Sequence, residues 1–168
     1  MPKFPRLAVA AVATAGLTLA LATQPAYAAR HLTPSQTRAI LIRAAHHHGL
    51  NPNFVLAVSY WESGWNQSAR SRTGAVGLMQ VEPYTAAAAG PALLHRRVNL
   101  NNPVDNAELG AALLRSYLDQ LHDPKLVLAA YYQGLSAVRR HGIYASSRSY
   151  VDGIWKVRNQ FQGAHLGG

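Results

Sequence analysis

Glu62 is the residue of this sequence whose position best suits acid–base chemistry. It ends an apolar run, FVLAVSYWE, in a chain of 168 residues that holds only seven carboxylates. A helix over this run would be buried, so desolvation would raise the pKa of the Glu62 carboxyl, and the negative end of the helix dipole would raise it further. A carboxyl that keeps its proton near neutral pH can protonate a poor leaving group such as a glycosidic oxygen. From this fragment alone, Glu62 could equally be an ordinary solvent-facing glutamate at the end of a helix.

Neutral polar residues and an aromatic ring follow Glu62 closely, as a saccharide site requires. The stretch ESGWNQSARSRTG supplies Trp65 together with a set of hydroxyls and amides: Ser63, Asn66, Gln67, Ser68, Ser71 and Thr73. The segment GLMQ adds Gln80 beside the apolar Met79, and the glycines around it let the backbone approach a ligand. Ordinary turn chemistry is the alternative for Ser68 and Thr73.

Three consecutive histidines, His46 to His48, invite a metal-site interpretation. Neighbouring helix positions point about 100° apart, so we do not expect these side chains to converge on one ion. The sequence has no cysteine, which excludes zinc–thiolate sites and cysteine nucleophiles. We therefore expect neither a metal nor another cofactor.

The elements that must position Glu62 are predicted to be helices. Thr33, Pro34 and Gln36 form a capping-box pattern before an apolar stripe that stops at Gly49. A second helix restarts at Asn51-Pro52 and should end at Gly64. Because this second helix is apolar nearly all round, it is predicted to be the central buried one.

The remainder of the sequence continues the helical pattern. Asp105, with Glu108 three residues later, predicts a capped helix, and Asp123-Pro124 predicts the start of the next. The segment SYVDGIWKVRNQFQ predicts a final amphipathic helix. With no alternating strand pattern and no repeat, the fold class is all-α, a compact multi-helix domain.

The first 28 residues have the pattern of a secretory signal peptide. MPKFPR is basic, the next 16 residues are apolar, and Ala26-Tyr27-Ala28 offers a cleavage site after Ala28. A membrane anchor is the alternative, but the apolar run is shorter than the roughly 20 residues that a spanning helix needs. We expect a domain over residues 29–168, secreted or associated with the cell wall and not stably anchored in a membrane.

The charge of the chain suggests which polymers it meets. The full sequence carries a formal charge of +9, and without Lys3 and Arg6 it has 14 basic residues against seven acidic ones. An exported basic protein adheres to anionic polymers, and cell-wall polymers are a simpler partner than nucleic acid, which we do not expect. Charge that only aids solubility is the alternative.

Several motifs in order resemble the soluble lytic transglycosylase catalytic domain. The segment ESGWNQSARSRTGAVGLMQVEPYTA is similar to the signature of that family, with matches that include Glu62-Ser63, Gly74-Ala75 and the run GLMQ. Downstream, NLNNPVDNAELGAALLRSYL, LAAYYQG and SRSYV resemble its later motifs. The resemblance spans about residues 33–161.

The resemblance implies a lysozyme-like, all-helical fold with a substrate cleft and a specific reaction. The family cleaves the β-1,4 bond between N-acetylmuramic acid and N-acetylglucosamine in peptidoglycan. By correspondence, Glu62 would protonate the glycosidic oxygen and then accept the proton of the muramoyl C6 hydroxyl, which yields a 1,6-anhydro sugar. The N-acetyl group of the substrate is thought to help carry the cationic intermediate, so no second carboxylate is needed.

The resemblance also implies roles for residues around Glu62. Ser63 and Gln80 would hold the substrate or Glu62, Met79 would line the cleft floor, and Tyr131 would orient the acid with its hydroxyl. Further substrate contacts would come from Ser71, Gln133 and Tyr150. Core packing with a satisfied hydroxyl is the alternative for each tyrosine.

Two positions depart from the family pattern. Tyr132-Gln133 replaces the Asn-Ala that follows the family's tyrosine, so Gln133 is expected to take over the role of the asparagine. Ser146 stands where the family often has a glutamate. These changes concern the subsites and not the reaction.

Two other functions remain open at this point. A muramidase would add water on the same fold, with Glu82 as its one candidate for a second carboxylate. A catalytically silent domain would only bind the wall. We expect a monomer whose partner is the peptidoglycan strand.

Overall fold

The computed structural model describes residues 32–164, and the predicted signal peptide lies outside this range. Within it the chain forms seven α-helices, one short 3-10 helix and two isolated β-bridges, with no strand. The predicted all-α class is confirmed. The helices are α1 (Pro34–His47), α2 (Pro52–Ser63), α3 (Pro83–Leu94), α4 (Pro103–Leu121), α5 (Pro124–Gln133), α6 (Leu135–His141) and α7 (Arg148–Ala164), and the 3-10 turn η1 is Ala145–Ser147.

Proline at the first position starts each of the helices α1 to α5, where its missing N–H removes no helical hydrogen bond. The capping box of Thr33 and Gln36 is confirmed, as are the predicted starts at Asn51 and Asp123. The side-chain oxygen of each of these three caps accepts a hydrogen bond from a backbone N–H of the first turn.

The predicted cap at Asp105 is wrong. Asn102 caps α4 by accepting from the backbone N–H groups of Val104 and Asp105, which leaves Asp105 inside the first turn. There its carboxylate lies near the positive end of the helix dipole and pairs with Arg96. Glu108 completes no capping box, because its carboxylate turns toward α1.

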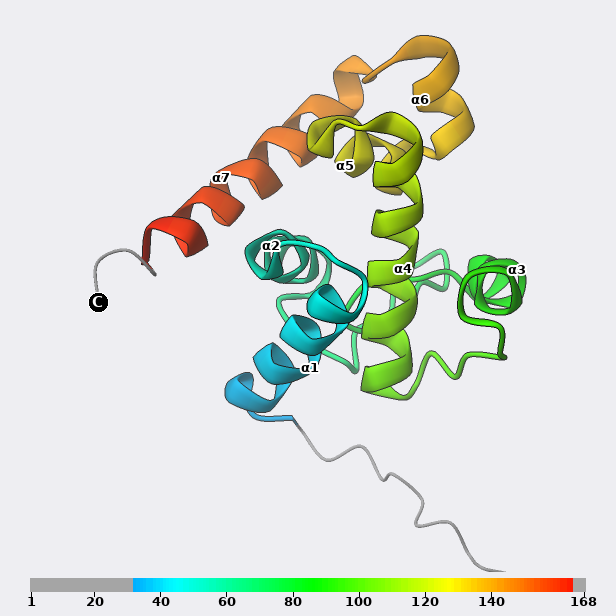
Figure 1. The fold of residues 1–168 in the computed structure, drawn as a ribbon, viewed down its shortest axis with the longest axis vertical. Coiled ribbons are helices and arrows are strands. Elements are labelled where there is room, and N and C mark those ends of the chain that lie inside the picture. Colours follow the sequence, from blue (N-terminus) through cyan, green and yellow to red (C-terminus); the bar gives the residue numbers. More distant parts are fainter. Residues whose placement is uncertain (1–31, 165–168) are drawn as a thin grey trace, which may run out of the picture.

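The helix α2 is the central buried element, as predicted. Every residue from 53 to 59 is buried, and α2 packs against α1 and α7. The long helix α4 contacts α1, α3 and α5, so α3 lies on one side of it and α1 with α2 on the other (Figure 1). Glu62 therefore lies where α2 leaves the core, on a helix that packs against α7.

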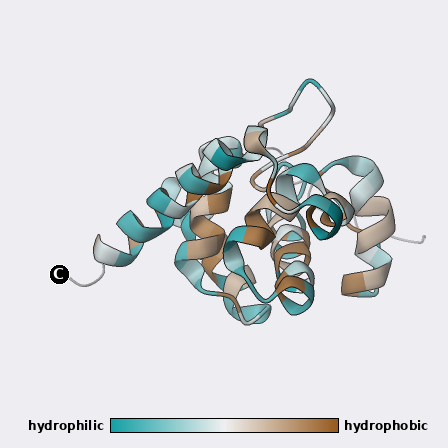
Figure 2. Cartoon of the chain, turned by 90° about the horizontal axis from the view of Figure 1, so that it is seen from above, coloured by the Kyte–Doolittle hydropathy of each residue, from teal (hydrophilic) through white to brown (hydrophobic). Residues whose placement is uncertain are grey.

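Polar and apolar residues are distributed unevenly over the helices. In Figure 2 the helix that leads to the C terminus is largely hydrophilic, whereas hydrophobic segments gather among the other helices. No helix among residues 32–164 combines the length and the apolar character needed to cross a bilayer.

Candidate active site

Glu62 lies in the last turn of α2, which ends where Gly64 takes up a left-handed conformation with φ 60°. The carboxyl is partly buried, and Oη of Tyr150 donates a hydrogen bond to its Oε1. Burial raises the pKa of the Glu62 carboxyl above its ordinary value, and the hydrogen bond from Tyr150 partly offsets this rise. The surroundings of Glu62 thus favour its protonated form, which is the form that a proton donor needs.

Aromatic rings fix Tyr150 in place from two sides. Tyr132 stacks on it with ring centroids 4.6 Å apart, and Trp61 meets it edge-on at 6.5 Å. Tyr150 is only 7% exposed, whereas Trp61 and Tyr132 are 45% and 59% exposed. The polar end of Tyr150 is therefore held on Glu62, while the two neighbouring aromatic side chains are partly exposed to solvent.

Tyr131 uses its hydroxyl differently from the sequence expectation. Its Oη donates a 2.8 Å hydrogen bond to the backbone carbonyl of Met79 and not to Glu62. Glu62 is nevertheless close, since burial first and the Glu62 charge second raise the pKa of Tyr131 well above its ordinary value. The expectation that Tyr131 orients the acid is wrong, and Tyr150 makes that contact.

The loop between α2 and α3 is tied to the end of α2 by hydroxyls. Ser59 Oγ and Ser63 Oγ each donate to the carbonyl oxygen of Leu78, both at 2.9 Å. Gln80 has a positive φ of 46°, and its amide donates to the Gly77 carbonyl at 2.9 Å. Ser63 and Gln80 thus brace the loop beside Glu62.

A buried asparagine on α4 also holds this loop, through hydrogen bonds to its backbone. Asn106 Oδ1 accepts from the Met79 N–H at 2.9 Å, and Nδ2 donates to the carbonyls of Val76 and Leu100. Gly77 has a φ of 79°, and a Cβ there would lie 2.5 Å from the Asn106 amide. The glycine in GLMQ is therefore required for both backbone conformation and close approach.

The other sequence-predicted residues also serve the framework. Ser71 Oγ accepts from the Ala75 N–H, and the Gln133 side chain bridges the Gly142 carbonyl and the Tyr144 N–H. Met79 has no exposed surface, because its side chain packs against Gly110 in the core. Its expected place on a cleft floor is wrong: Met79 supports the loop from inside.

The remaining six carboxylates, all within residues 32–164, have partners away from Glu62. Glu82 accepts a 2.6 Å hydrogen bond from Thr73, and Asp123 caps α5. The other four form ion pairs: Asp105 with Arg96, Asp119 with Arg115, Asp152 with Lys125, and Glu108 with two histidines. Glu62 is the carboxyl that stands out for acid chemistry.

The family model described as "Transglycosylase SLT domain" matches residues 39–153, which is more than half of the chain. This chain belongs to the SLT domain family. The expected membership and the lysozyme-like, all-helical fold that it implied are confirmed. The match includes Glu62, the loop that follows it and both tyrosines.

Relatives of this SLT domain are named as transglycosylases, and one of the two described here as a lytic murein transglycosylase. It is 34% identical over 116 residues to the transglycosylase of Enterobacteria phage PRD1, covering 69% of this chain and 40% of the relative. It is 28% identical over 138 residues to the membrane-bound lytic murein transglycosylase C of Haemophilus influenzae, covering 70% and 39%. The chain thus spans about two fifths of the length of these relatives.

Solved structures agree with the fold. An inactive Glu-to-Gln mutant of lytic transglycosylase Slt from Pseudomonas aeruginosa superposes with a TM-score of 0.67 at 28% identity, over 74% of this chain and 24% of that one. The 70-kDa soluble lytic transglycosylase bound to bulgecin A gives 0.71 at 22% identity, over 80% and 25%. The second likeness shows the fold alone.

Sequence reasoning missed three residues of the SLT domain site. Trp61 and Tyr132 frame Tyr150, and Asn106 holds the loop. In the sequence, Tyr132 is notable only as a departure from the family pattern. A polar residue at a fully buried helix position is a signal that could have drawn attention to Asn106, because such groups need partners.

Proposed function

We propose that this SLT domain is a peptidoglycan lytic transglycosylase with Glu62 as its single acid and base. The observation that carries the proposal is the Glu62 carboxyl: partly buried, with a raised pKa, and held by the hydroxyl of Tyr150. The names of its relatives and the inactive Glu-to-Gln mutant of a similar structure support the same role.

The reaction needs one carboxyl that first gives and then takes a proton. Glu62 donates its proton to the oxygen of the β-1,4 bond as the bond from the anomeric carbon breaks, and the electron pair stays on the leaving oxygen. The Glu62 carboxylate then accepts the proton of the muramoyl C6 hydroxyl, which attacks the anomeric carbon. The anhydro product forms without water, and Glu62 returns to its protonated state.

Residues around Glu62 take supporting roles in this proposal. Tyr150 keeps the carboxyl in one orientation, while Trp61 and Tyr132, which are both exposed, are aromatic side chains of the kind that stack on sugar rings. Ser63, Ser71, Gln80 and Gln133 hold the surrounding loops, so they shape the place where the glycan strand binds.

The partner and the location follow the same reasoning. Peptidoglycan is the partner, and the excess of basic residues adds attraction to anionic wall polymers. The leader-like first 28 residues would direct the enzyme to the wall.

Mass spectrometry of digested peptidoglycan tests the proposal. The expected products carry 1,6-anhydromuramoyl ends, each one water lighter than a reducing end, and Glu62→Gln should produce none. Products with reducing ends only would show a hydrolytic muramidase instead. Binding to the wall without any released product would show a domain that only adheres.

A further inference from the structure

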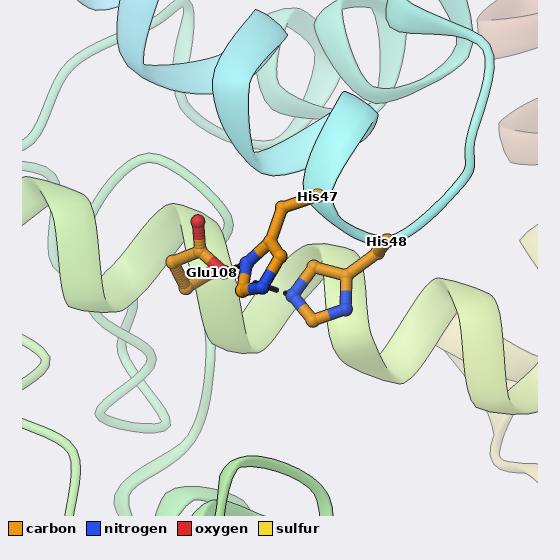
Figure 3. Close-up of side chains that lie close together, drawn as sticks. All are labelled: His47, His48 and Glu108. Atoms are coloured by element: carbon orange, nitrogen blue, oxygen red, sulfur yellow. Dashed lines mark hydrogen bonds and ion pairs between the residues drawn. The ribbon is translucent and has the colours of Figure 1, made fainter.

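A cluster of two histidines and a glutamate joins the end of α1 to α4 (Figure 3). None of the three is among the residues assigned to Glu62 chemistry. Nδ1 of His47 lies 2.7 Å from Oε2 of Glu108, and Nε2 of His48 lies 2.9 Å from the same oxygen. The three ligand atoms all lie within 4.8 Å of one another. Three groups that commonly bind metals thus meet at one point.

The sequence argument against convergence fails because α1 ends within the histidine run. His47 is the last helical residue, and His48 is the C-cap with φ −97° and ψ 13°, outside helical geometry. The two rings therefore lie side by side, with centroids 4.8 Å apart, in place of the 100° separation expected along a helix. His46 does not belong to the cluster.

We propose that His47, His48 and Glu108 bind a divalent transition-metal ion of the Zn²⁺ type. Two imidazole nitrogens and one carboxylate oxygen are the ligands that Zn²⁺ takes in many three-ligand sites, with solvent in the fourth position. Tetrahedral bonds of about 2.0–2.2 Å place ligand atoms about 3.3 Å apart. Each histidine nitrogen therefore has to move about half an ångström away from the Glu108 oxygen. The two nitrogens already lie within 4.8 Å of each other, and the exposed His47 ring can adjust to bring them to the same spacing. A single cation then replaces the two imidazole protons that point at the carboxylate oxygen.

The three side chains of the cluster differ in burial, so a metal ion would reach them from the His47 side. The side chains of His48 and Glu108 are 13% and 16% exposed, so their positions are set by packing, whereas that of His47 is 69% exposed and can adjust. The exposed side offers the ion an entry path and a place for its solvent ligand. The ion would clamp the end of α1 to α4 in a chain that has no cysteine for a disulfide. This role is independent of the proposed function.

Isothermal titration with Zn²⁺ tests the site, using the chain from residue 29 to 168 without a polyhistidine tag. We expect one ion per chain and a higher Tm in its presence. His47→Gln, His48→Gln and Glu108→Gln should each weaken binding more than about tenfold, since even the outer partners of a metal site are worth about 10–100-fold. His46→Gln is the matched control, a neighbour in the same run, and should bind like the parent. Mg²⁺, which prefers oxygen ligands, should not compete.

Several outcomes would overturn the proposal. No binding would mean that the cluster is held by hydrogen bonds alone. An equal loss in His46→Gln would mean that an exposed histidine tract attracts the ion without a built site. His47→Gln guards against a misleading loss through misfolding, because its side chain is largely exposed, and its Tm without metal should match the parent. Full Zn²⁺ affinity in this folded variant would also refute the site.

Discussion

Two tyrosines approach Glu62 from different helices and do different work. The hydroxyl of Tyr150 on α7 donates a hydrogen bond to the Glu62 carboxyl, whereas the hydroxyl of Tyr131 on α5 donates one to the backbone carbonyl of Met79. The α7 side therefore holds the acid, and the α5 side holds the loop that follows it. Two tyrosines that both lie near Glu62 thus have different roles: Tyr150 affects the proton of the Glu62 carboxyl, and Tyr131 affects the position of the loop.

The largest effect should come from Glu62 itself, on which both sides converge. Glu62→Gln keeps the size of the side chain but has no proton to transfer, so activity on peptidoglycan should fall by about 10²–10⁴-fold or below detection. Release of anhydro products over time measures this loss. A variant within tenfold of the parent would remove Glu62 from the mechanism.

The same variant should gain stability at neutral pH. Because burial raises the folded-state pKa of Glu62, the protonated carboxyl stabilises the fold at low pH, and this stability is lost as pH rises through the raised pKa. Thermal melts should show equal Tm values for Glu62→Gln and the parent near pH 3.5 and a higher Tm for the variant at pH 7.5. A lower Tm at pH 7.5 would contradict the burial argument.

Tyr150→Phe should give the next largest effect, on activity and its pH profile. A hydrogen bond to a charged group is worth about 1.5–3 kcal/mol, which corresponds to roughly 10- to 150-fold in rate. Since the Tyr150 hydrogen bond lowers the pKa of Glu62, its removal should move the alkaline limb of the pH–rate profile to higher pH. A slower enzyme with an unmoved limb would indicate a structural role only.

Helix starts and the central helix could be predicted because they depend on local chemistry. Thr33, Asn51 and Asp123 each cap a helix with their own side chain, and α2 is apolar nearly all round. Asp105 failed as a cap because the helix begins three residues earlier, where Asn102 accepts from the N–H groups of Val104 and Asp105. The choice between two neighbouring cap residues cannot be predicted when each is considered on its own.

The division between the tyrosines and the histidine cluster could not be predicted, since both depend on contacts between distant segments. Tyr150 and Glu62 are 88 residues apart, and His47 and Glu108 are 61 apart. Family correspondence placed a tyrosine near the acid but could not say which hydroxyl reaches it. The helical angle rule misled at His48 because the helix ends one residue earlier.

Tyr131→Phe should lower stability more than activity, which separates the α5 side from the α7 side. It leaves the Met79 carbonyl without its donor, and an unsatisfied buried group costs about 1–3 kcal/mol. Urea unfolding measures this change, and kcat should fall by less than in Tyr150→Phe. Tyr84→Phe, at a position that is 76% exposed, is the control and should change stability by less than about 0.5 kcal/mol. Greater loss of kcat in Tyr131→Phe than in Tyr150→Phe would reverse the division.

Gly153→Ala should produce the smallest effect and act on the α7 side alone. A Cβ at Gly153 would collide with the ring of Trp61, which packs edge-on against Tyr150. Replacing glycine inside a helix normally gains up to about 1 kcal/mol, but overpacking costs about 1–3 kcal/mol, so the net change should be a modest loss of stability. Gly163→Ala, on the same helix with nothing within 4 Å of the new methyl group, should be neutral or stabilising. Gly153→Ala should also affect activity. Because the displaced Trp61 disturbs the Tyr150 ring that holds Glu62, kcat should fall while the hydrogen bond from Tyr131 to Met79 stays intact. Equal behaviour of the two alanine variants in melts and turnover would show that Trp61 does not constrain Tyr150.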